Sequence, residues 1–321
     1  MVTPTEIIAL LFPGQGSQAV GMGRALAESF PIAAETFQEA DNILDFPLSD
    51  LCWNGPEEQL KDTINTQPAL LTHSIAVLRV LNAQFPSFKA SFAAGHSMGE
   101  FAALVAAGSL TFHDGLICVR ERGLLMKDAG EDSPGGMMAV LGLELQKVEE
   151  VCQIITQGSN PSIWIANDNC PGQIVISGET AGLKEAESAL SSAGARKVVR
   201  LAVSIPSHCP LMSGAQEKFN RVLDETPFVD PEFPVVGNGS AALMHTSDEI
   251  KKDLGAQLVT RVRWTESMQT LIASGVHRCY EIGPGNVLSG LMRRIDRSVP
   301  TFPLDSPTSL SSLSEYFVET G

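Results

Sequence analysis

Short apolar runs alternate with amphipathic stretches along this chain, and that alternation is typical of an α/β fold with a mainly parallel sheet. The apolar run 7–12 has the length of a buried strand and ends at a Pro-Gly pair. Leu71, Ile75 and Leu78 recur at helical spacing, which predicts a helix over about 69–84. The same pattern predicts a short strand at 91–94 and helices over 98–107 and about 113–129.

The middle of the chain has a different order of predicted elements. The pattern there gives strand, helix, strand, strand, helix, strand, at 137–141, about 144–156, 162–167, 173–177, about 179–193 and 196–203. This is the β-α-β-β-α-β order of a ferredoxin-like unit. We therefore expect a small domain, 133–203, inserted into a discontinuous large α/β domain made of 1–132 and 204–321. The second part of the large domain is expected to hold helices over about 210–226 and 247–259 and a strand at 277–282.

Composition and charge narrow the class of protein. The chain has 321 residues, of which 44% are hydrophobic, so it can bury one large core and one small one and is not expected to be disordered. Lys and Arg number 22 against 37 Asp and Glu, a net charge of −15. A surface this acidic argues against general binding to nucleic acid or to an anionic membrane.

The cysteines and the N-terminal sequence indicate a cytoplasmic protein. The six cysteines are at least 18 residues apart in the sequence, so neither a zinc site nor any other metal site is expected, and reduced buried thiols are favoured. The N-terminal apolar run lacks a preceding basic region and is too short for a signal peptide or a membrane span.

The strongest chemical signal is a G-x-S-x-G pentapeptide within Ala94–Glu100, between a predicted strand and a predicted helix. Such a turn presents Ser97 as a nucleophile at the start of the helix, where backbone N–H groups stabilise developing negative charge. The N–H of Met98 is then one expected donor of an oxyanion hole. The alternative is a chance occurrence in a chain that has 28 glycines.

A serine nucleophile needs a base, and six histidines are available: His73, His96, His113, His208, His245 and His277. His208 is the preferred base because it lies in a Pro-bounded loop, Ser204–Cys209, where the chain returns from the inserted domain. His96 adjoins the serine and should point away from it. No acidic residue stands out as the third member of a triad, so a backbone carbonyl is the alternative partner for the histidine.

Two further features permit more than one interpretation. The loop Phe12–Gln18, FPGQGSQ, imitates a dinucleotide fingerprint but lacks the acidic residue expected about 20 positions later, so it equally suits a second oxyanion donor at Gln15. Arg120 and Arg122 follow on a predicted helix. Each belongs either to an ion-paired surface or, if it points inward, to a site that binds a carboxylate through two hydrogen bonds.

These motifs together resemble the malonyl-CoA:acyl carrier protein transacylase family over roughly residues 7–305. The matching segments occur in order: FPGQGSQ at 12–18, TQPALL at 66–71, GHSMGE at 95–100, RG at 122–123, NDNCPGQIVISG at 167–178, SIPSHCPLM at 204–212 and EIGPGNVLSGL at 281–291. The resemblance implies a hydrolase-like α/β domain with a ferredoxin-like insertion, in agreement with the predicted element order. It also implies a role in fatty acid or polyketide synthesis, and a monomer is expected because nothing in the sequence requires more than one chain.

By that resemblance, Ser97 carries the malonyl group as an ester and His208 is the base in both half-reactions. Gln15 and Met98 supply the oxyanion N–H groups, and Arg122 binds the malonyl carboxylate. Gln257 corresponds to the residue whose backbone carbonyl orients the histidine, and Asn238 is expected near the site. The family usually has leucine where Met98 stands, a change that leaves the backbone N–H in place.

The implied reaction is a ping-pong transfer from malonyl-CoA to the phosphopantetheine thiol of an acyl carrier protein, with no bound cofactor. Two other readings compete: a serine hydrolase or thioesterase whose acceptor is water, and a non-catalytic dinucleotide-binding or docking protein. An acidic carrier protein would need a local basic surface. Three clusters are candidates: Arg196, Lys197 and Arg200; Arg261 and Arg263; and Arg293, Arg294 and Arg297.

Overall fold

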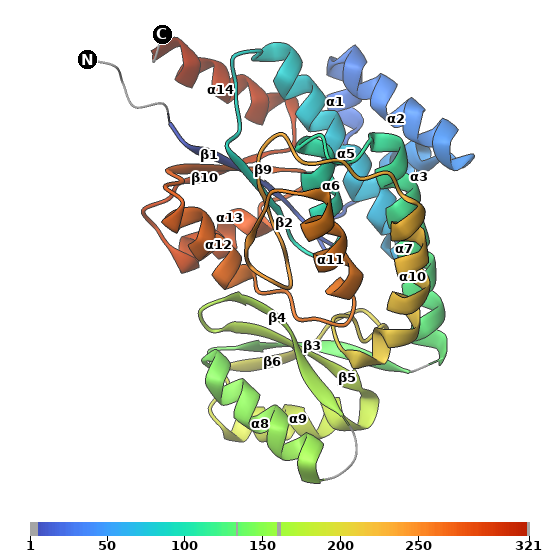
Figure 1. Ribbon diagram of the computed structural model, residues 1–321, viewed down its shortest axis with the longest axis vertical. Helices are drawn as coiled ribbons and strands as arrows, with labels where there is room; N and C mark the ends of the chain where they lie inside the picture. Colours follow the sequence, from blue (N-terminus) through green and yellow to red (C-terminus); the bar gives the residue numbers. More distant parts are fainter. Residues whose placement is uncertain (1–5, 133, 159–161, 320–321) are drawn as a thin grey trace.

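The computed structural model describes residues 6–132, 134–158 and 162–319, which form two β-sheets with their covering helices (Figure 1). The larger sheet has six strands in the order β10-β9-β1-β2-β7-β8. Neighbouring strands pair in parallel except β7 and β8, so the prediction of a mainly parallel sheet is confirmed. The strand bounds are Ile8–Phe12 (β1), Phe92–Gly95 (β2), Val235–Val236 (β7), Leu243–Met244 (β8), Arg278–Ile282 (β9) and Thr301–Leu304 (β10).

Strand β1 lies at the centre of this sheet, and its apolar composition follows from that position. All five of its residues are buried, between β2 on one side and β9 on the other. Ile8, Leu10 and Phe12 join one hydrophobic cluster, whereas Ala9 and Leu11 face a second cluster on the opposite face. A strand covered on both faces reads as a continuous apolar run, as this one does.

Most helices of the molecule surround the larger sheet (Figure 1). Their bounds are Arg24–Ser29 (α1), Pro31–Leu44 (α2), Leu48–Asn54 (α3), Glu57–Lys61 (α4), Thr63–Gln84 (α5), Gly99–Ala106 (α6), Phe112–Asp132 (α7), Ser213–Glu225 (α10), Ser247–Gln257 (α11), Trp264–Ala273 (α12), Val287–Ile295 (α13) and Pro307–Glu319 (α14). The pattern of the sequence predicts α5, α6, α7, α10 and α11 but not the other seven. No helix in the described part of the chain is long and apolar enough to cross a membrane.

Helix α5 begins six residues before its predicted start. A side-chain cap and one tertiary hydrogen bond stabilise this additional segment. The Asp62 side chain caps the helix by accepting from the Ile64 N–H. Pro68 lies within the helix and cannot donate to the Ile64 carbonyl four residues earlier. Arg120 of α7 donates to that carbonyl instead, at 3.0 Å. A tertiary contact therefore satisfies the acceptor that the proline leaves free.

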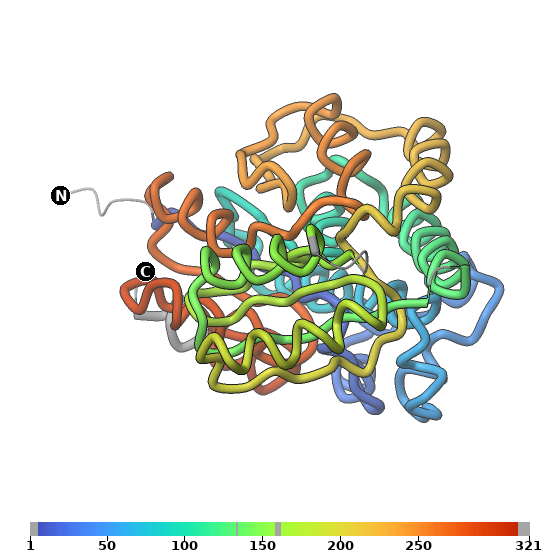
Figure 2. Tube along the Cα trace, turned by 90° about the horizontal axis from the view of Figure 1, so that it is seen from below, coloured from blue at the N-terminus to red at the C-terminus, as the bar shows by residue number. Residues whose placement is uncertain are grey.

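The second sheet has four strands in the order β4-β5-β3-β6, and every neighbouring pair in it is antiparallel. The chain order is β3 (Gly135–Leu141), α8 (Leu145–Gly158), β4 (Ile163–Cys170), β5 (Gln173–Glu179), α9 (Thr180–Ser192) and β6 (Lys197–Arg200). This is the predicted order of strands and helices. Helices α8 and α9 lie side by side against the sheet and share one hydrophobic cluster with it (Figure 2).

Two predicted elements after the second sheet's helices have different bounds in the structure, and one predicted boundary cannot be compared. Strand β6 has four residues rather than eight, and 201–203 lead out of the sheet toward the loop that contains His208. The helix predicted over 210–226 is divided into a 3₁₀ turn, Pro210–Met212, and α10. The predicted start of the inserted domain, residue 133, lies outside the described residues.

Candidate active site

Ser97 lies in a tight turn between β2 and α6, in a conformation that few non-glycine residues adopt. Its φ is +53°, in the left-handed region, which is a sign of local backbone strain. Both glycines of the pentapeptide are required by close packing. A Cβ at Gly95 would overlap the backbone of Gly99, and a Cβ at Gly99 would overlap the carbonyl of Phe12. The G-x-S-x-G segment is therefore a strained strand-to-helix elbow, as the sequence predicts.

His208 meets Ser97 across the site. The Nε2 of His208 lies 2.8 Å from the Ser97 Oγ, and its Nδ1 lies 3.0 Å from the Gln257 carbonyl oxygen. Because a carbonyl can only accept, Nδ1 carries the proton and Nε2 is free to accept from the serine hydroxyl. Burial, followed by the nearby Arg122 charge, lowers the pKa of His208 to about 3, so the imidazole is neutral at pH 7.

Asn238 holds the elbow through two hydrogen bonds to its backbone. Its Oδ1 accepts from the Ser97 N–H at 2.7 Å, and its Nδ2 donates to the Gly95 carbonyl at 2.7 Å. The side chain is buried, so both bonds form away from bulk water. Asn238 fixes the backbone on either side of His96 and so stabilises the turn that presents the serine.

The two arginines of α7 have different environments. Arg122 is buried and points inward, and its Nη2 lies 3.2 Å from the Ser97 Oγ. Arg120 points toward α5, where it donates to the Asn65 side chain at 2.7 Å and stacks on Phe46. The structure thus distinguishes the two arginines: only Arg122 lies beside the serine.

The two predicted oxyanion donors approach the elbow in different ways. Met98 follows Ser97 at the start of α6, where the first N–H groups of a helix have no carbonyl partner within the helix. Gln15 belongs to the loop after β1. That loop packs on the elbow: the His96 N–H donates to the Phe12 carbonyl at 2.9 Å, and a Cβ at Gly14 would overlap the His96 carbonyl. The Gln15 side chain accepts from Thr63 at 3.0 Å.

Several site residues escape prediction from the sequence. Gln67 accepts from the Arg122 Nη1 at 2.8 Å, and Glu100 accepts from the Gln257 side chain at 2.6 Å. Asn169 lies 2.8 Å from the His96 Nε2 and so holds that ring. These three residues lie within the motifs TQPALL, GHSMGE and NDNCPGQ. The motifs, however, do not show which side chains are in contact.

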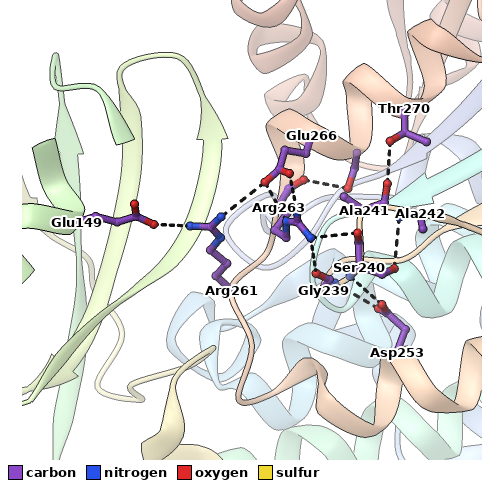
Figure 3. Close-up of polar contacts among 11 residues, drawn as sticks. Glu149, Gly239, Ser240, Ala241, Ala242, Asp253, Arg261, Arg263, Glu266 and Thr270 are labelled. Carbon is purple, nitrogen blue, oxygen red and sulfur yellow. Dashed lines mark hydrogen bonds and ion pairs between the residues drawn. The ribbon is translucent and has the colours of Figure 1, made fainter. Parts of the chain in front are cut away.

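A cavity of about 500 Å³ reaches His208 beside the second sheet. Helix α8 and strand β4 form one wall, and the loop Val259–Arg261 forms the other. At its edge Arg261 bonds Glu149 of α8 at 2.7 Å, so an ion pair joins the two sides (Figure 3). Arg261 and Arg263 also pair with Glu266. Acidic partners therefore balance this basic cluster, while the other two predicted clusters remain candidate docking surfaces.

The fold and the site together define a class. An α/β protein with a serine at a strand-to-helix elbow, a neutral histidine on its hydroxyl and a buried arginine beside it is an enzyme of serine-dependent acyl chemistry. The family model for the acyl transferase domain matches residues 9–299. This chain belongs to that acyl transferase family.

Individual relatives cover nearly the whole chain. The malonyl CoA-acyl carrier protein transacylase of Bacillus subtilis (strain 168) is 44% identical over 303 residues, which are 94% of this chain and 95% of the relative. The crystal structure of the malonyl-CoA:acyl carrier protein transacylase of Xanthomonas oryzae pv. oryzae is 42% identical, with a TM-score of 0.93 over 98% of this chain and 99% of that one.

A further solved structure contains a protein partner. It is described as a type II PKS acyl-carrier protein in complex with its malonyl-transacylase. The match is 40% identical, with a TM-score of 0.93, and covers 97% of this chain and 100% of the matched chain.

Proposed function

We propose that this protein transfers the malonyl group of malonyl-CoA to the phosphopantetheine thiol of an acyl carrier protein, through an ester on Ser97. The observation that carries the proposal is the buried Arg122, whose guanidinium lies 3.2 Å from the Ser97 Oγ. In a malonyl ester of the Ser97 Oγ, the free carboxylate carbon is two bonds from the ester carbonyl carbon. At that position the carboxylate would reach the Arg122 guanidinium. The acceptor supplies extender units to fatty acid or polyketide synthesis, as the names of the relatives support.

In the first half-reaction the Ser97 Oγ attacks the thioester carbonyl carbon, and the hydroxyl proton passes to the Nε2 of His208. The carbonyl oxygen becomes an oxyanion, which the N–H groups of Met98 and Gln15 stabilise. The C–S bond then breaks, and His208 returns its proton to the departing CoA sulfur. The products are malonyl-Ser97 and free CoA, and His208 is again neutral.

The second half-reaction repeats these steps with the carrier thiol as nucleophile. His208 takes the thiol proton while sulfur attacks the ester carbonyl, and the proton passes to the Ser97 Oγ as the C–O bond breaks. CoA leaves before the carrier thiol reacts, and the serine holds the malonyl group in between, so the mechanism is ping-pong. The cavity beside His208 provides the approach for the thiol of each substrate.

The backbone carbonyl of Gln257 takes the place that an acidic residue has in a Ser-His-Asp triad. It holds the Nδ1 proton and thereby the tautomer in which Nε2 accepts. A carbonyl dipole stabilises the protonated ring less than a full carboxylate would. Its neutrality suits a site that must also receive the negatively charged malonyl group.

The proposal also covers the division of the chain into domains. We infer a hydrolase-like large domain, 1–132 and 204–321, and a ferredoxin-like insertion, 133–203. Separate hydrophobic clusters for the two sheets support this division. One chain supplies every proposed site residue, which suits a monomer, and six free buried cysteines suit the cytoplasm.

The test separates transfer from hydrolysis. The protein is mixed with malonyl-CoA and examined by intact mass, then given holo acyl carrier protein. Malonyl-enzyme followed by malonyl-carrier supports the proposal, whereas release of free malonate without carrier acylation identifies a thioesterase. In Ser97→Ala the malonyl adduct should be absent; an adduct that persists there would remove Ser97 from the mechanism.

A further inference from the structure

We infer that the Gln257 side chain is a positioning residue that keeps Glu100 away from Arg122, so that the guanidinium stays free for the carboxylate of the acyl donor. This inference rests on the proposed malonyl transfer. It is separate from the role of the Gln257 backbone carbonyl, which contacts His208. The side chain acts on selectivity, and the carbonyl acts on the base.

The Gln257 amide bridges an acid and a cation. Its Nε2 donates to the Glu100 Oε2 at 2.6 Å and to the Ser97 carbonyl at 3.1 Å. Its Oε1 accepts from the Arg122 Nη2 at 2.8 Å. Glu100, Arg122 and Gln257 are each at most 1% exposed, so water cannot screen the acid from the cation.

Arg122 has no ionic partner in the described part of the chain. Its hydrogen bonds go to the neutral side chains of Gln67, Met126, Ser97 and Gln257. A buried charged group without an opposite charge is rare because its desolvation is not offset. An unpaired cation beside the nucleophile is therefore available to an anionic group of the substrate.

The charge states agree with this arrangement. Burial, with a contribution from Asp253, raises the pKa of Glu100 well above its ordinary range, although Gln257 and Arg122 oppose the shift. Burial lowers the pKa of Arg122 to about 10, which leaves it charged at pH 7. A direct contact between Glu100 and Arg122 would ionise the acid and occupy the guanidinium that the substrate needs.

A carboxamide has the properties that this position requires. Its oxygen accepts from the arginine without adding charge, and its NH₂ donates to the acid. A methionine of similar length would leave Glu100 free to approach Arg122. A glutamate would place a second carboxylate directly on Arg122.

The test compares malonyl-CoA with acetyl-CoA, because only the former has a carboxylate. In Gln257→Met the ratio of kcat/KM for malonyl over acetyl should fall about 10- to 100-fold. Adding Glu100→Gln removes the competing carboxylate and should restore the ratio to within a few-fold of that of Glu100→Gln alone. Gln257→Glu should lose malonyl preference in both backgrounds, since its carboxylate lies on Arg122.

Each outcome decides the inference. A ratio unchanged in Gln257→Met, or a ratio that Glu100→Gln fails to restore, would overturn it, because a purely structural glutamine gives no such rescue. Labelling of Ser97 by a fluorophosphonate, read by intact mass, reports an intact Ser97–His208 pair in every variant. If the fluorophosphonate does not label Gln257→Met, the test rests on Gln257→Glu. A Gln257→Glu protein that is labelled and still prefers malonyl-CoA over acetyl-CoA would overturn the inference. A wild-type protein that forms no malonyl-serine would instead reject the proposed function.

Discussion

The Nε2 of His208 lies 2.8 Å from the Ser97 Oγ, and on the other side of the ring the Nδ1 bonds a backbone carbonyl and no acidic side chain of the described residues. This relationship makes the imidazole a neutral base whose properties depend on burial and on a carbonyl. Its consequences can be measured through pH, substrate choice and stability.

The rate of Ser97 acylation should stay constant to well below pH 6. The base is active when unprotonated, and burial lowers the pKa of His208 from 6.5 to about 3. The acid limb of kcat/KM for malonyl-enzyme formation should therefore lie below about pH 5 rather than near 6.5. Rapid-quench measurement of the adduct between pH 4 and pH 8 provides the profile. A limb centred near 6.5 would contradict a neutral, buried base.

Replacement of Arg122 by alanine should reduce the preference for malonyl-CoA over acetyl-CoA. Two charge-assisted hydrogen bonds to the substrate carboxylate contribute about 2–3 kcal/mol, equivalent to roughly 30- to 150-fold in the ratio of kcat/KM. Arg120→Ala is the matched control, because Arg120 lies on the same helix but contacts Asn65 and Phe46. Equal ratios in the two variants would remove Arg122 from carboxylate recognition.

Asn238→Ala should lower kcat more than it raises KM. The substitution removes both hydrogen bonds to the elbow, at Ser97 N–H and the Gly95 carbonyl, and lets the strained turn relax. We expect about a 10- to 100-fold loss in kcat and a loss of about 1–3 kcal/mol in the free energy of unfolding. Asn42→Ala, at the surface, should change neither. An unchanged kcat in Asn238→Ala would mean that the turn keeps its conformation without the Asn238 side chain.

His73→Gln should reduce the acid sensitivity of folding. Burial lowers the pKa of His73 from 6.5 to about 4, so between those values the unfolded state binds more protons than the folded state. Its contribution to stability is therefore full above pH 6.5 and is lost as the pH falls, by roughly 3 kcal/mol at pH 4.

Urea unfolding at pH 7 and pH 4.5 measures this effect. The loss of stability on acidification should be smaller in His73→Gln than in the wild type. His113→Gln is the control, because the His113 side chain is largely exposed. If the wild type and both variants lose the same free energy, His73 does not contribute to acid unfolding.

Glu149→Gln should lower KM for malonyl-CoA. The Glu149 carboxylate pairs with Arg261 at the cavity that reaches His208 (Figure 3), and its removal leaves more positive charge beside the approach of an anionic donor. The effect should weaken at high salt. Glu150→Gln, which breaks an exposed pair with Lys147 on the same helix, should leave KM unchanged. A KM that stays constant in Glu149→Gln would exclude Arg261 from donor binding.

The sequence predicts the larger elements because each has a strong local pattern. The apolar run 7–12 predicts a buried strand, and its residues Ile8–Phe12 form β1. The strands β7 and β8 have two residues each, too few for any period to be detected, so they exist only through pairing with their neighbours. The first six residues of α5 also depend on tertiary structure, because Arg120 of α7 satisfies the acceptor that Pro68 leaves free.

By itself the sequence indicated Ser97 and His208 as the candidate nucleophile and base, and the structure places these two side chains 2.8 Å apart. Gly95 and Gly99 flank Ser97 because the elbow leaves no room for a Cβ, and this steric need is visible as a motif. The choice between Arg120 and Arg122 was different. Arg120 and Arg122 lie two positions apart in one helix and so on nearly opposite faces, and only packing decides which face is buried.

The tertiary structure alone decided how the partners of these residues are arranged. Gln257 is 160 residues from Ser97 in the chain, yet its carbonyl meets His208 and its amide lies between Glu100 and Arg122. Hydrogen bonds between residues far apart in the chain form at about 3 Å and produce no pattern in the local sequence. They form only where the fold has buried the groups together, and burial also gives the histidine, the acid and the arginine their charge states.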